Sequence, residues 1–325
     1  MDKVFTQKRV LGESRRRQPM TGKTYWTSSK ILLRETVFEG QLVNLTPLRI
    51  GAGREPPLGA LVDLAVLRIK IGDKNLPYIP GSSLKGVFRS HAEAIARVKD
   101  PKTCTGLSKG TCIETKTYFD PSSGETNLAK YIEEKLKHNE PEKAMEAFFK
   151  TACLMCKIFG APSYASKAVF SDAYPDGETK LGIRTGVAIS RKTGAVAFGP
   201  YQVEYVEPGS RFSFALTLRN IPNYALGLIA HVLNMVESGE VRIGGFKTRG
   251  FGKVTIENIR FRNREVGGTS SVLRSLEEGV DQEVDISSLV VQKNGWAVSE
   301  GSKCLQLMDR LMEVWDNAKL TSHQE

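Results

Sequence analysis

Four of the five cysteines lie in one segment of the chain, with a spacing that suits a metal ion. Seven residues separate Cys104 from Cys112, and a C-x-x-C pair, Cys153 and Cys156, follows after 40 further residues. The pair has the spacing of a structural zinc site, and the loop-borne cysteines could complete a tetrahedron. His138 is a substitute ligand, and four reduced cysteines in a small helical insert are the alternative. A site closed by four cysteines has no open position, so this zinc would hold the segment together rather than catalyse.

The stretch IGGFKTRGFGK, residues 243–253, combines bare backbone with positive charge. Clustered glycines cost conformational entropy on folding, which indicates that something approaches this backbone closely. The P-loop motif fails because Phe251 stands where lysine is needed, and the dinucleotide fingerprint fails because Thr255 replaces its last glycine. A path for an RNA backbone fits better, with Phe246 or Phe251 available to stack on bases. The residues expected to meet RNA here are Gly244, Gly245, Lys247, Arg249, Gly250, Gly252 and Lys253.

A second stretch, PGSSLKG at residues 80–86, places small residues where a helix is expected to begin. The free N–H groups and the dipole of a helix start favour phosphate. Ser82 or Ser83 can cap this helix, and Lys85 and Arg89 lie four residues apart on one face. We therefore count these four side chains as candidate RNA contacts. An ordinary capped helix with a solvated basic face is the alternative.

One acid stands out for catalysis. Asp63 ends the Gly/Pro-rich segment GAGREPPLGALVD and has few acidic neighbours. A carboxylate beside an RNA backbone can hold a divalent ion or accept a proton from a ribose hydroxyl. A strand-edge aspartate that faces water is the alternative. The chain has only four histidines, none in a protease-like setting, which disfavours a histidine-pair ribonuclease and nucleophilic catalysis.

The composition favours a polyanion as partner. The 325 residues are 40% hydrophobic and 25% charged, as in soluble globular proteins, and carry a net charge of +10. A field of this sign attracts nucleic acid, although a merely soluble basic surface would give the same total. The basic start of the chain lacks the apolar run of a secretory signal, and the longest apolar stretch, YALGLIAHVL, is too short to span a bilayer. We therefore expect a cytoplasmic protein without a membrane partner.

Hydrophobic patterning predicts the elements that position these residues. Strands are expected from residue 37, near residue 66 and after residue 167, and a helix follows the PGSSLKG turn. A long hairpin at about 183–208 has RKTG at its tip, where Arg191 and Lys192 are further candidate RNA contacts. A strand near 211–220 and a helix near 221–239 precede the glycine loop, and a last strand follows it. Without the hairpin and the cysteine-rich segment, the order is βαββαβ, that of an α+β, ferredoxin-like or RNA-recognition type fold.

This pattern divides the chain into four parts. We expect a basic N-terminal extension at 1–36, a core made of 37–98 and 165–262, a cysteine-rich zinc insert at 99–164, and a C-terminal extension at 263–325. The last part is polar, with one amphipathic helix near 302–318.

Three stretches together resemble a known family. LPYIPGSSLKGVFRS, GGFKTRGFGKV and the hairpin SRKTGAVAFGPYQVEYVEPGSRF are similar to the RAMP superfamily, in particular to the repeated backbone subunits of type III CRISPR effector complexes of the Csm and Cmr kinds. The resemblance spans about residues 37–262. It implies a modified RNA-recognition fold that binds the CRISPR guide RNA (crRNA), stacks as a filament, and meets target RNA and other subunits of the complex. The hairpin would be a thumb that displaces a base from the guide–target duplex, and metal-bearing inserts occur in the family.

The resemblance also implies a reaction. Catalytic members cut target RNA with an acid in the loop before the LPYIPGSSLKG stretch and a divalent metal such as Mg²⁺ or Mn²⁺, and Asp63 matches that acid. The ribose 2′-hydroxyl would be the nucleophile, leaving a cyclic phosphate and a 5′-hydroxyl. Two alternatives remain open: a non-catalytic crRNA-binding scaffold, and a standalone endoribonuclease that processes the guide precursor, which the few histidines disfavour.

Overall fold

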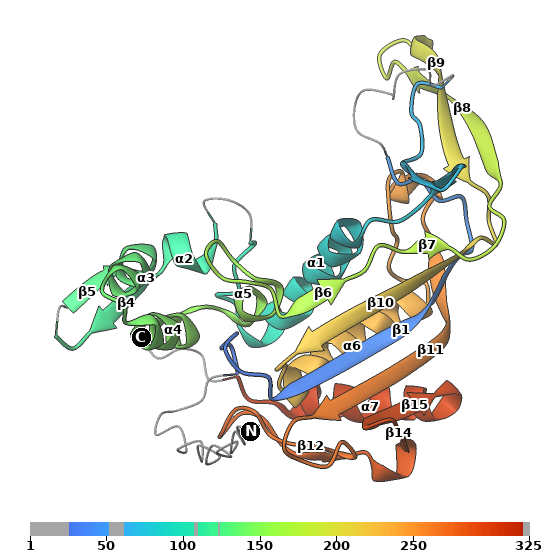
Figure 1. The fold of residues 1–325 in the computed structure, drawn as a ribbon. Coiled ribbons are helices and arrows are strands. Elements are labelled where there is room, and N and C mark those ends of the chain that lie inside the picture. The colour runs from blue at the N-terminus through green and yellow to red at the C-terminus, as the bar shows by residue number, and fades with distance from the viewer. Residues whose placement is uncertain (1–25, 52–61, 107–109, 123, 321–325) are drawn as a thin grey trace, which may run out of the picture.

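The computed structural model describes residues 26–51, 62–106, 110–122 and 124–320, and Figure 1 shows their arrangement. The amino-terminal residues 1–25 and the central part of the Gly/Pro-rich segment, residues 52–61, lie outside the described residues. Most of the predicted basic extension and the two prolines before Asp63 are therefore not part of the structural account. In the described part, no helix combines the length and the apolar character needed to cross a membrane.

An antiparallel sheet forms the centre of the molecule. Its spatial order is β14-β15-β11-β1-β10-β6, and the short β7 also pairs with β10. The strands alternate between buried and exposed positions, as in β10, where Phe212, Phe214, Leu216 and Leu218 are buried. This period of two gives the sheet one face toward the core and one face toward solvent. The strands are β1 (Arg34–Asn44), β6 (Ala168–Phe170), β7 (Tyr174–Pro175), β10 (Arg211–Arg219), β11 (Val254–Glu265), β14 (Val291–Lys293) and β15 (Trp296–Glu300).

Helices cover one face of this sheet. In Figure 1, α6 (Asn223–Glu237) and α7 (Gly301–Asn317) lie behind the strands, and α1 (Gly81–Lys99) packs on α6 and β6. The expected apolar face of α1 lies inward, because Leu84, Val87, Phe88 and Ala92 are buried. Along the chain, the central elements follow in the order β1, α1, β6, β10, α6 and β11.

The cysteine-rich segment forms a lobe between α1 and β6, at the side of the sheet (Figure 1). Its described residues form a short hairpin and four helices. The side chain of Asn127 caps the start of one helix by accepting hydrogen bonds from the backbone N–H groups of Ala129 and Lys130. Tyr131 donates to Asp120 at 2.6 Å, which fastens that helix to the hairpin. The elements are α2 (Cys112–Thr115), β4 (Thr117–Asp120), β5 (Gly124–Asn127), α3 (Leu128–Lys137), α4 (Pro141–Thr151) and α5 (Leu154–Phe159).

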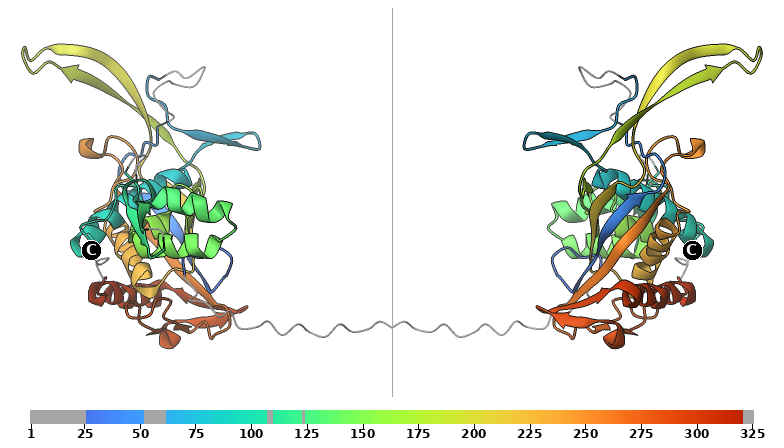
Figure 2. Two further views of the ribbon diagram at one scale, coloured as in Figure 1. Left: turned by 90° about the vertical axis from the view of Figure 1, so that its left-hand side faces the viewer. Right: turned by 90° about the vertical axis from the view of Figure 1, so that its right-hand side faces the viewer.

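A long hairpin projects from the body of the molecule (Figure 2). Its strands are β8 (Leu181–Ile189) and β9 (Val196–Val206), which pair Gly182 with Tyr205 and Gly186 with Tyr201. The two tyrosine rings lie across the two glycines, because a Cβ on either glycine would overlap the ring opposite. A smaller hairpin of β2 (Arg68–Ile71) and β3 (Lys74–Pro77) projects toward the opposite side in Figure 2.

The ends of the described chain pack into the core. Beyond residue 263, β15 extends the sheet by pairing with β11, and α7 packs on α6. Trp26 is fully buried and donates to Glu277 at 2.8 Å, and Arg34 forms a buried ion pair with Glu265. The described parts of both predicted extensions are thus continuous with the core. The remaining short elements are β12 (Val272–Leu273), β13 (Val284–Asp285) and the 3₁₀ turns η1 (Lys247–Arg249) and η2 (Ser287–Leu289).

Candidate nucleic-acid interface and metal centre

The glycine loop at 243–253 lies against the base of the long hairpin. Its ends pair with each other, since Ile243 donates its N–H to the carbonyl of Gly252 at 2.9 Å. Gly245 donates to the carbonyl of Arg49 at 2.8 Å, and Gly252 donates to that of Pro47 at 2.9 Å. The loop is therefore fixed to the chain that leaves β1.

The protein itself explains two of the four glycines in this loop. Gly244 has a φ of +85° and Gly252 a φ of +80°, a conformation that side chains rarely adopt. A Cβ on Gly244 would overlap the carbonyl oxygen of Arg49, and one on Gly252 would overlap that of Ile243. The expectation that all four glycines make room for RNA needs this correction. Only Gly250, with a φ of +88° and open space around it, and the partly exposed Gly245 leave backbone free of such overlap.

Arginines and aromatic rings alternate where the loop meets the hairpin. The guanidinium of Arg49 lies 5.6 Å from the ring centre of Phe246, and that of Arg249 lies 5.3 Å from it. Arg249 also donates to the hydroxyl of Tyr201 on β9, at 3.1 Å. Phe246 is partly exposed. Arg249 is thus exposed, but its guanidinium is oriented by the ring of Phe246 and the hydroxyl of Tyr201.

In the second half of this stack, the central ring is buried between an exposed arginine and a partly exposed tyrosine. Phe251 is only 3% exposed and packs edge-on against Tyr205, with 5.8 Å between ring centres. Arg184 of β8 lies 5.0 Å from the Phe251 ring centre and 5.8 Å from that of Tyr205. The prediction that Phe251 is available for base stacking is therefore wrong, because the ring helps to join the hairpin to the sheet.

Asp63 lies at the same hairpin base. It is exposed, and one carboxylate oxygen accepts the backbone N–H of Gln202 at 2.7 Å. Its second oxygen, Oδ1, has no hydrogen-bond partner among the described residues. Leu64 pairs with β9 beside it, donating to the carbonyl of Gln202 at 3.1 Å. Asp63 and Arg249 are thus held by consecutive residues of β9, Gln202 and Tyr201.

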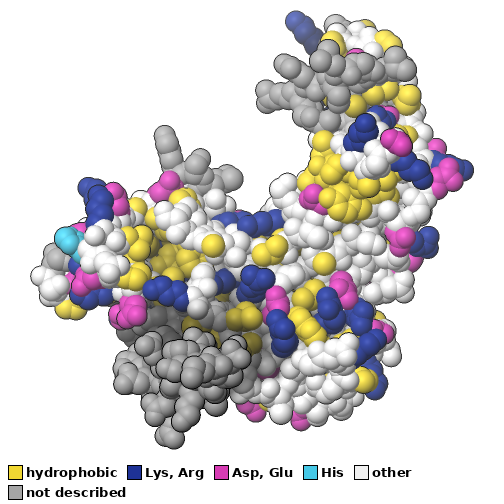
Figure 3. All heavy atoms as spheres, in the orientation of Figure 1, with side chains coloured by type: hydrophobic (Ala, Val, Ile, Leu, Met, Phe, Trp, Pro, Cys, Tyr) yellow, Lys and Arg dark blue, Asp and Glu magenta, His cyan; other side chains and the backbone are white. Residues whose placement is uncertain are grey.

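The predicted cations differ in their exposure. Arg191 and Lys192 are exposed at the hairpin tip, and Lys247 is exposed on the loop. Lys253 is partly buried, with its side chain against Gly239 at the end of α6. The face in Figure 3 is hollowed between the cysteine-rich lobe and the hairpin, and Lys and Arg side chains appear along the floor of this hollow.

The start of α1 is already occupied by a carboxylate. The cap residue is Pro80, no side chain of the PGSSLKG stretch caps the helix, and Gly81 donates its N–H to Asp172 at 2.7 Å. The prediction that Ser82 or Ser83 caps this helix is wrong, because the acid from the β6–β7 connection takes that place. Ser82 is exposed and Ser83 is partly exposed, so both side chains are accessible.

The two basic residues of α1 differ in their surroundings. Burial lowers the pKa of Lys85, and the nearby positive charge of Arg89 lowers it further. Arg89 donates to Glu93 at 2.9 Å and to the carbonyl of Gly160 at 3.2 Å. Gly160 ends α5, so Arg89 reaches toward the cysteine-rich lobe and is not free on a solvated face.

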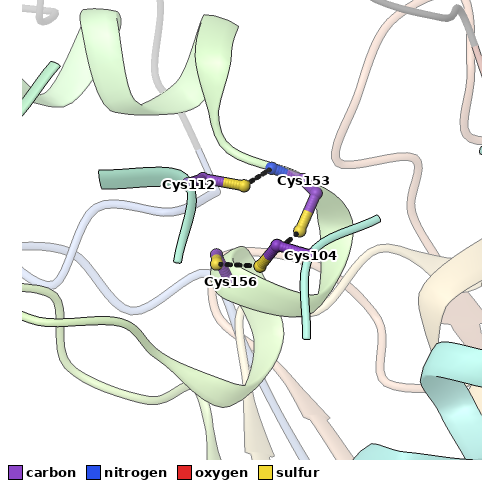
Figure 4. Close-up of side chains that lie close together, drawn as sticks. All are labelled: Cys104, Cys112, Cys153 and Cys156. Atoms are coloured by element: carbon purple, nitrogen blue, oxygen red, sulfur yellow. Dashed lines mark hydrogen bonds between the residues drawn. The ribbon is translucent and has the colours of Figure 1, made fainter. Parts of the chain in front are cut away.

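The four predicted cysteine ligands come together (Figure 4). Their sulfur atoms all lie within 4.8 Å of one another, with Cys104 3.2 Å from Cys156 and 3.5 Å from Cys153. Four sulfurs around a zinc ion at about 2.3 Å stand about 3.8 Å apart, so this cluster needs little rearrangement to bind one. Among the described residues, the group contains no histidine, so His138 is not a ligand here.

The thiols also influence one another. Hydrogen bonds from Cys112 first, and then from Cys153 and Cys156, lower the pKa of Cys104. Hydrogen bonding with Cys104 raises the pKa of Cys112 and of Cys156. Thiolates are soft ligands that select zinc and similar metals, and Cys112, Cys153 and Cys156 are buried. The cluster could therefore hold a metal ion such as zinc.

A mixed α+β fold with an antiparallel sheet, a projecting hairpin and a glycine loop at its base defines the structural class. The RAMP superfamily model matches residues 41–255, more than half of the chain. The chain therefore belongs to the RAMP superfamily, and this membership is consistent with CRISPR-associated subunits that bind guide RNA. No curated protein matches the chain.

Sequence reasoning missed several residues of this site. Arg49, Arg184 and Asp172 carry no local signal, because their partners lie far away in the sequence. Tyr201 and Tyr205 did carry a sequence signal, because they are four residues apart, as are Gly182 and Gly186 of the opposite strand. Pairing these two spacings would have indicated two rings laid across two glycines.

Proposed function

We propose that this chain is a crRNA-binding backbone subunit of a type III CRISPR effector complex that also cleaves target RNA. The observation that carries the proposal is the common anchorage of Asp63 and Arg249 on Gln202 and Tyr201 of β9. An acid for cleavage and a cation for phosphate are thus fixed to one rigid strand, beside a projecting hairpin. RAMP membership supplies the class of partner, and the cytoplasm is the compartment that this function implies.

The fold supports RNA recognition of the ferredoxin-like, RNA-recognition type. The central strands lie in the order β11-β1-β10-β6, with a helix after β1 and another after β10. In this arrangement the guide backbone follows the glycine loop, where Lys247 and Arg249 meet phosphates and Gly245 and Gly250 leave room for them. Ser82, Ser83 and Lys85 at the start of α1 are proposed as further contacts.

The hairpin supports the thumb role. Its outer part exposes apolar side chains that a solitary domain has no reason to present to water, and Arg191 and Lys192 flank them with positive charge. One chain would insert this hairpin beside the next copy, a head-to-tail contact that does not close and so builds a filament. The exposed apolar residues of the hairpin are Ile183, Val187, Ile189, Val196 and Phe198.

Asp63 would act on the target strand. Its Oδ1, which has no hydrogen-bond partner in the described part of the chain, can accept the proton of a ribose 2′-hydroxyl, while the N–H of Gln202 holds the other oxygen in place. The 2′-oxygen then attacks the adjacent phosphorus, the 5′-oxygen leaves, and a cyclic phosphate and a 5′-hydroxyl result. In the metal-dependent form of the reaction, Oδ1 of Asp63 would instead hold a divalent ion such as Mg²⁺, with RNA phosphates completing its shell. Such an ion would stabilise charge on the phosphate.

The cysteine cluster is proposed as a structural zinc site. Cys104, Cys112, Cys153 and Cys156 join the loop after α1, the start of α2 and the start of α5. Zinc bound there would tie three separate segments of the lobe and would leave no position for a substrate.

The test uses the assembled complex with its guide and a complementary target RNA. Asp63→Asn keeps an acceptor for Gln202 but removes the charge, and Asp63→Ala removes both. We expect both variants to bind guide normally and to lose cleavage by about 10²-fold or more. Asp73→Ala, an exposed acid on the β2–β3 turn, is the matched control. Normal cleavage by both Asp63 variants would leave the scaffold function, in which the bond between Asp63 and Gln202 is only structural. Cutting of precursor by the free chain would indicate guide processing.

A further inference from the structure

Arg89 has one guanidinium nitrogen that is buried beside the cysteine cluster. Nε donates to Glu93 and Nη1 to Gly160, but Nη2 is buried and has no hydrogen-bond partner among the described residues. A buried N–H group without a partner costs about 1–3 kcal/mol, more when the group is charged. This nitrogen is therefore expected to gain an acceptor when a ligand or an ion binds nearby.

Gly106 shows where that nitrogen lies. This glycine has a φ of +68°, and a Cβ there would overlap Nη2 of Arg89. Its backbone also forms a hydrogen bond with the sulfur of Cys104 that lowers the pKa of this thiol, after the larger effects of the other cysteines. The guanidinium of Arg89 therefore lies over Gly106, two residues after Cys104, in the space that the missing side chain leaves open.

The charges around Arg89 agree with this position. Burial lowers the pKa of Arg89, but the hydrogen bond with Glu93 and the negative charges of Cys156, Glu93 and Cys104 raise it overall. Four thiolates around a divalent ion leave two negative charges in a largely buried place, which need compensation. Glu93 already balances the positive charge of Arg89 on α1. The negative charge of the cluster would be a second partner for the same guanidinium.

A second basic residue lies next to a cluster cysteine in the sequence. Lys157 follows Cys156 directly, is 5% exposed, and has its ammonium 4.4 Å from the ring centre of Phe149. Burial lowers the pKa of Lys157, and the negative charges of Glu277 and then of Cys153 oppose that effect. Two basic side chains, the half-buried Arg89 of α1 and the buried Lys157 of the lobe, are thus near the proposed centre.

We infer that Arg89 is an outer-shell residue of the metal centre, whose Nη2 donates to the metal-bound thiolates and thereby fastens the cysteine-rich lobe to α1. This inference rests on the proposed zinc site and replaces the RNA contact expected for Arg89. It gives α1 two separate roles: its exposed start faces RNA, and its third turn holds the lobe. Arg89 does not touch the reacting atoms, so its role is one of positioning and charge balance.

The test measures zinc affinity of the full chain without RNA, by competition with a colorimetric chelator. Outer-shell changes typically lower metal affinity by about 10–100-fold, and we expect this for Arg89→Gln, with partial recovery in Arg89→Lys. Arg97→Gln is the control, because Arg97 pairs with the same Glu93 at 3.5 Å but is 41% exposed. We expect the control to stay within about twofold of the unchanged chain, since a pair this exposed contributes little.

The outcomes separate this inference from the site on which it rests. If the unchanged chain binds no zinc, the metal centre and the role of Arg89 both fail. If it binds zinc tightly and Arg89→Gln binds equally tightly, only the role of Arg89 fails. A Co²⁺-loaded Arg89→Lys chain gives a second measurement should Arg89→Gln not fold: an unshifted thiolate-to-metal absorption band would refute the hydrogen bond, and a shifted band supports it. Guide affinity of the zinc-loaded variants should stay unchanged, and its loss with zinc affinity intact would restore the RNA contact.

Discussion

The glycine loop allows an experiment that separates the demands of the fold from those of RNA. Gly250 and Gly252 lie two residues apart with nearly equal φ angles, +88° and +80°. They differ in their surroundings, because a Cβ on Gly252 would overlap the carbonyl oxygen of Ile243, while nothing lies within 4 Å of a Cβ on Gly250. Gly252→Ala and Gly250→Ala are therefore a matched pair.

The expected difference in stability follows from this geometry. Alanine in a left-handed conformation costs about 1–2 kcal/mol at either position. The gain from a less flexible unfolded chain, about 0.4–1 kcal/mol, is also common to both variants. Only Gly252→Ala must shift backbone as well, which costs about 1–3 kcal/mol more. The free energy of unfolding should therefore fall by about 1–3 kcal/mol more for Gly252→Ala than for Gly250→Ala.

Urea unfolding of the two purified variants measures this difference, provided that the slope with denaturant stays the same. Guide RNA affinity is measured on the same preparations, under conditions where both are folded. We expect Gly250→Ala to lose affinity out of proportion to its small loss of stability, because its new methyl group stands where the RNA backbone is proposed to pass. Equal losses of stability would refute the packing argument, and full guide affinity in Gly250→Ala would refute the RNA path over this glycine.

Three further predictions concern other parts of the molecule. Arg249→Ala should weaken guide binding and reduce its salt slope by about 1, measured across a salt series, and an unchanged slope would remove Arg249 from the phosphate path. Burial lowers the pKa of Lys167 to about 8, and the positive charge of Arg219 adds to the effect. Between pH 8 and the ordinary pKa of 10.5, the unfolded chain therefore binds more protons than the folded chain, so the free energy of unfolding should rise with pH. Lys167→Met should flatten this rise in unfolding curves measured across the interval. Metal analysis should find one zinc per chain, and a strong chelator should lower the unfolding temperature; a chain that loses no stability on chelation would contradict a structural zinc.

Local patterns predicted the features that depend on neighbours in the sequence. The apolar period of α1 marked Leu84 and Phe88 as core residues, and both are buried. The C-x-x-C spacing indicated a metal cluster, and the structure brings Cys153 and Cys156 together with two cysteines from the preceding 50 residues. These signals are readable because a helix face or a ligand pair is set within a few residues.

Contacts between distant segments could not be predicted in this way. Asp172 accepts the N–H of Gly81 at the start of α1 although it lies 91 residues away in the sequence. Arg49 stacks on Phe246, which is also far from it in the sequence. Glycine was a second source of error, because Gly244 and Gly252 look like a ligand loop but are needed for close backbone packing. The sequence around an aromatic residue such as Phe251 does not show whether its ring is exposed for stacking on bases or buried between the hairpin and the sheet.

The outer half of the long hairpin also has a consequence for the life of the protein in a cell. Phe198 is 70% exposed and Ile189 is 62% exposed, so the described part of the chain leaves both largely uncovered. Exposed apolar patches of this kind promote aggregation when no partner covers them. Surplus copies should therefore be removed by proteolysis or lost to aggregates, so that matched synthesis of partners, and not the folding of this chain alone, limits how much of it accumulates.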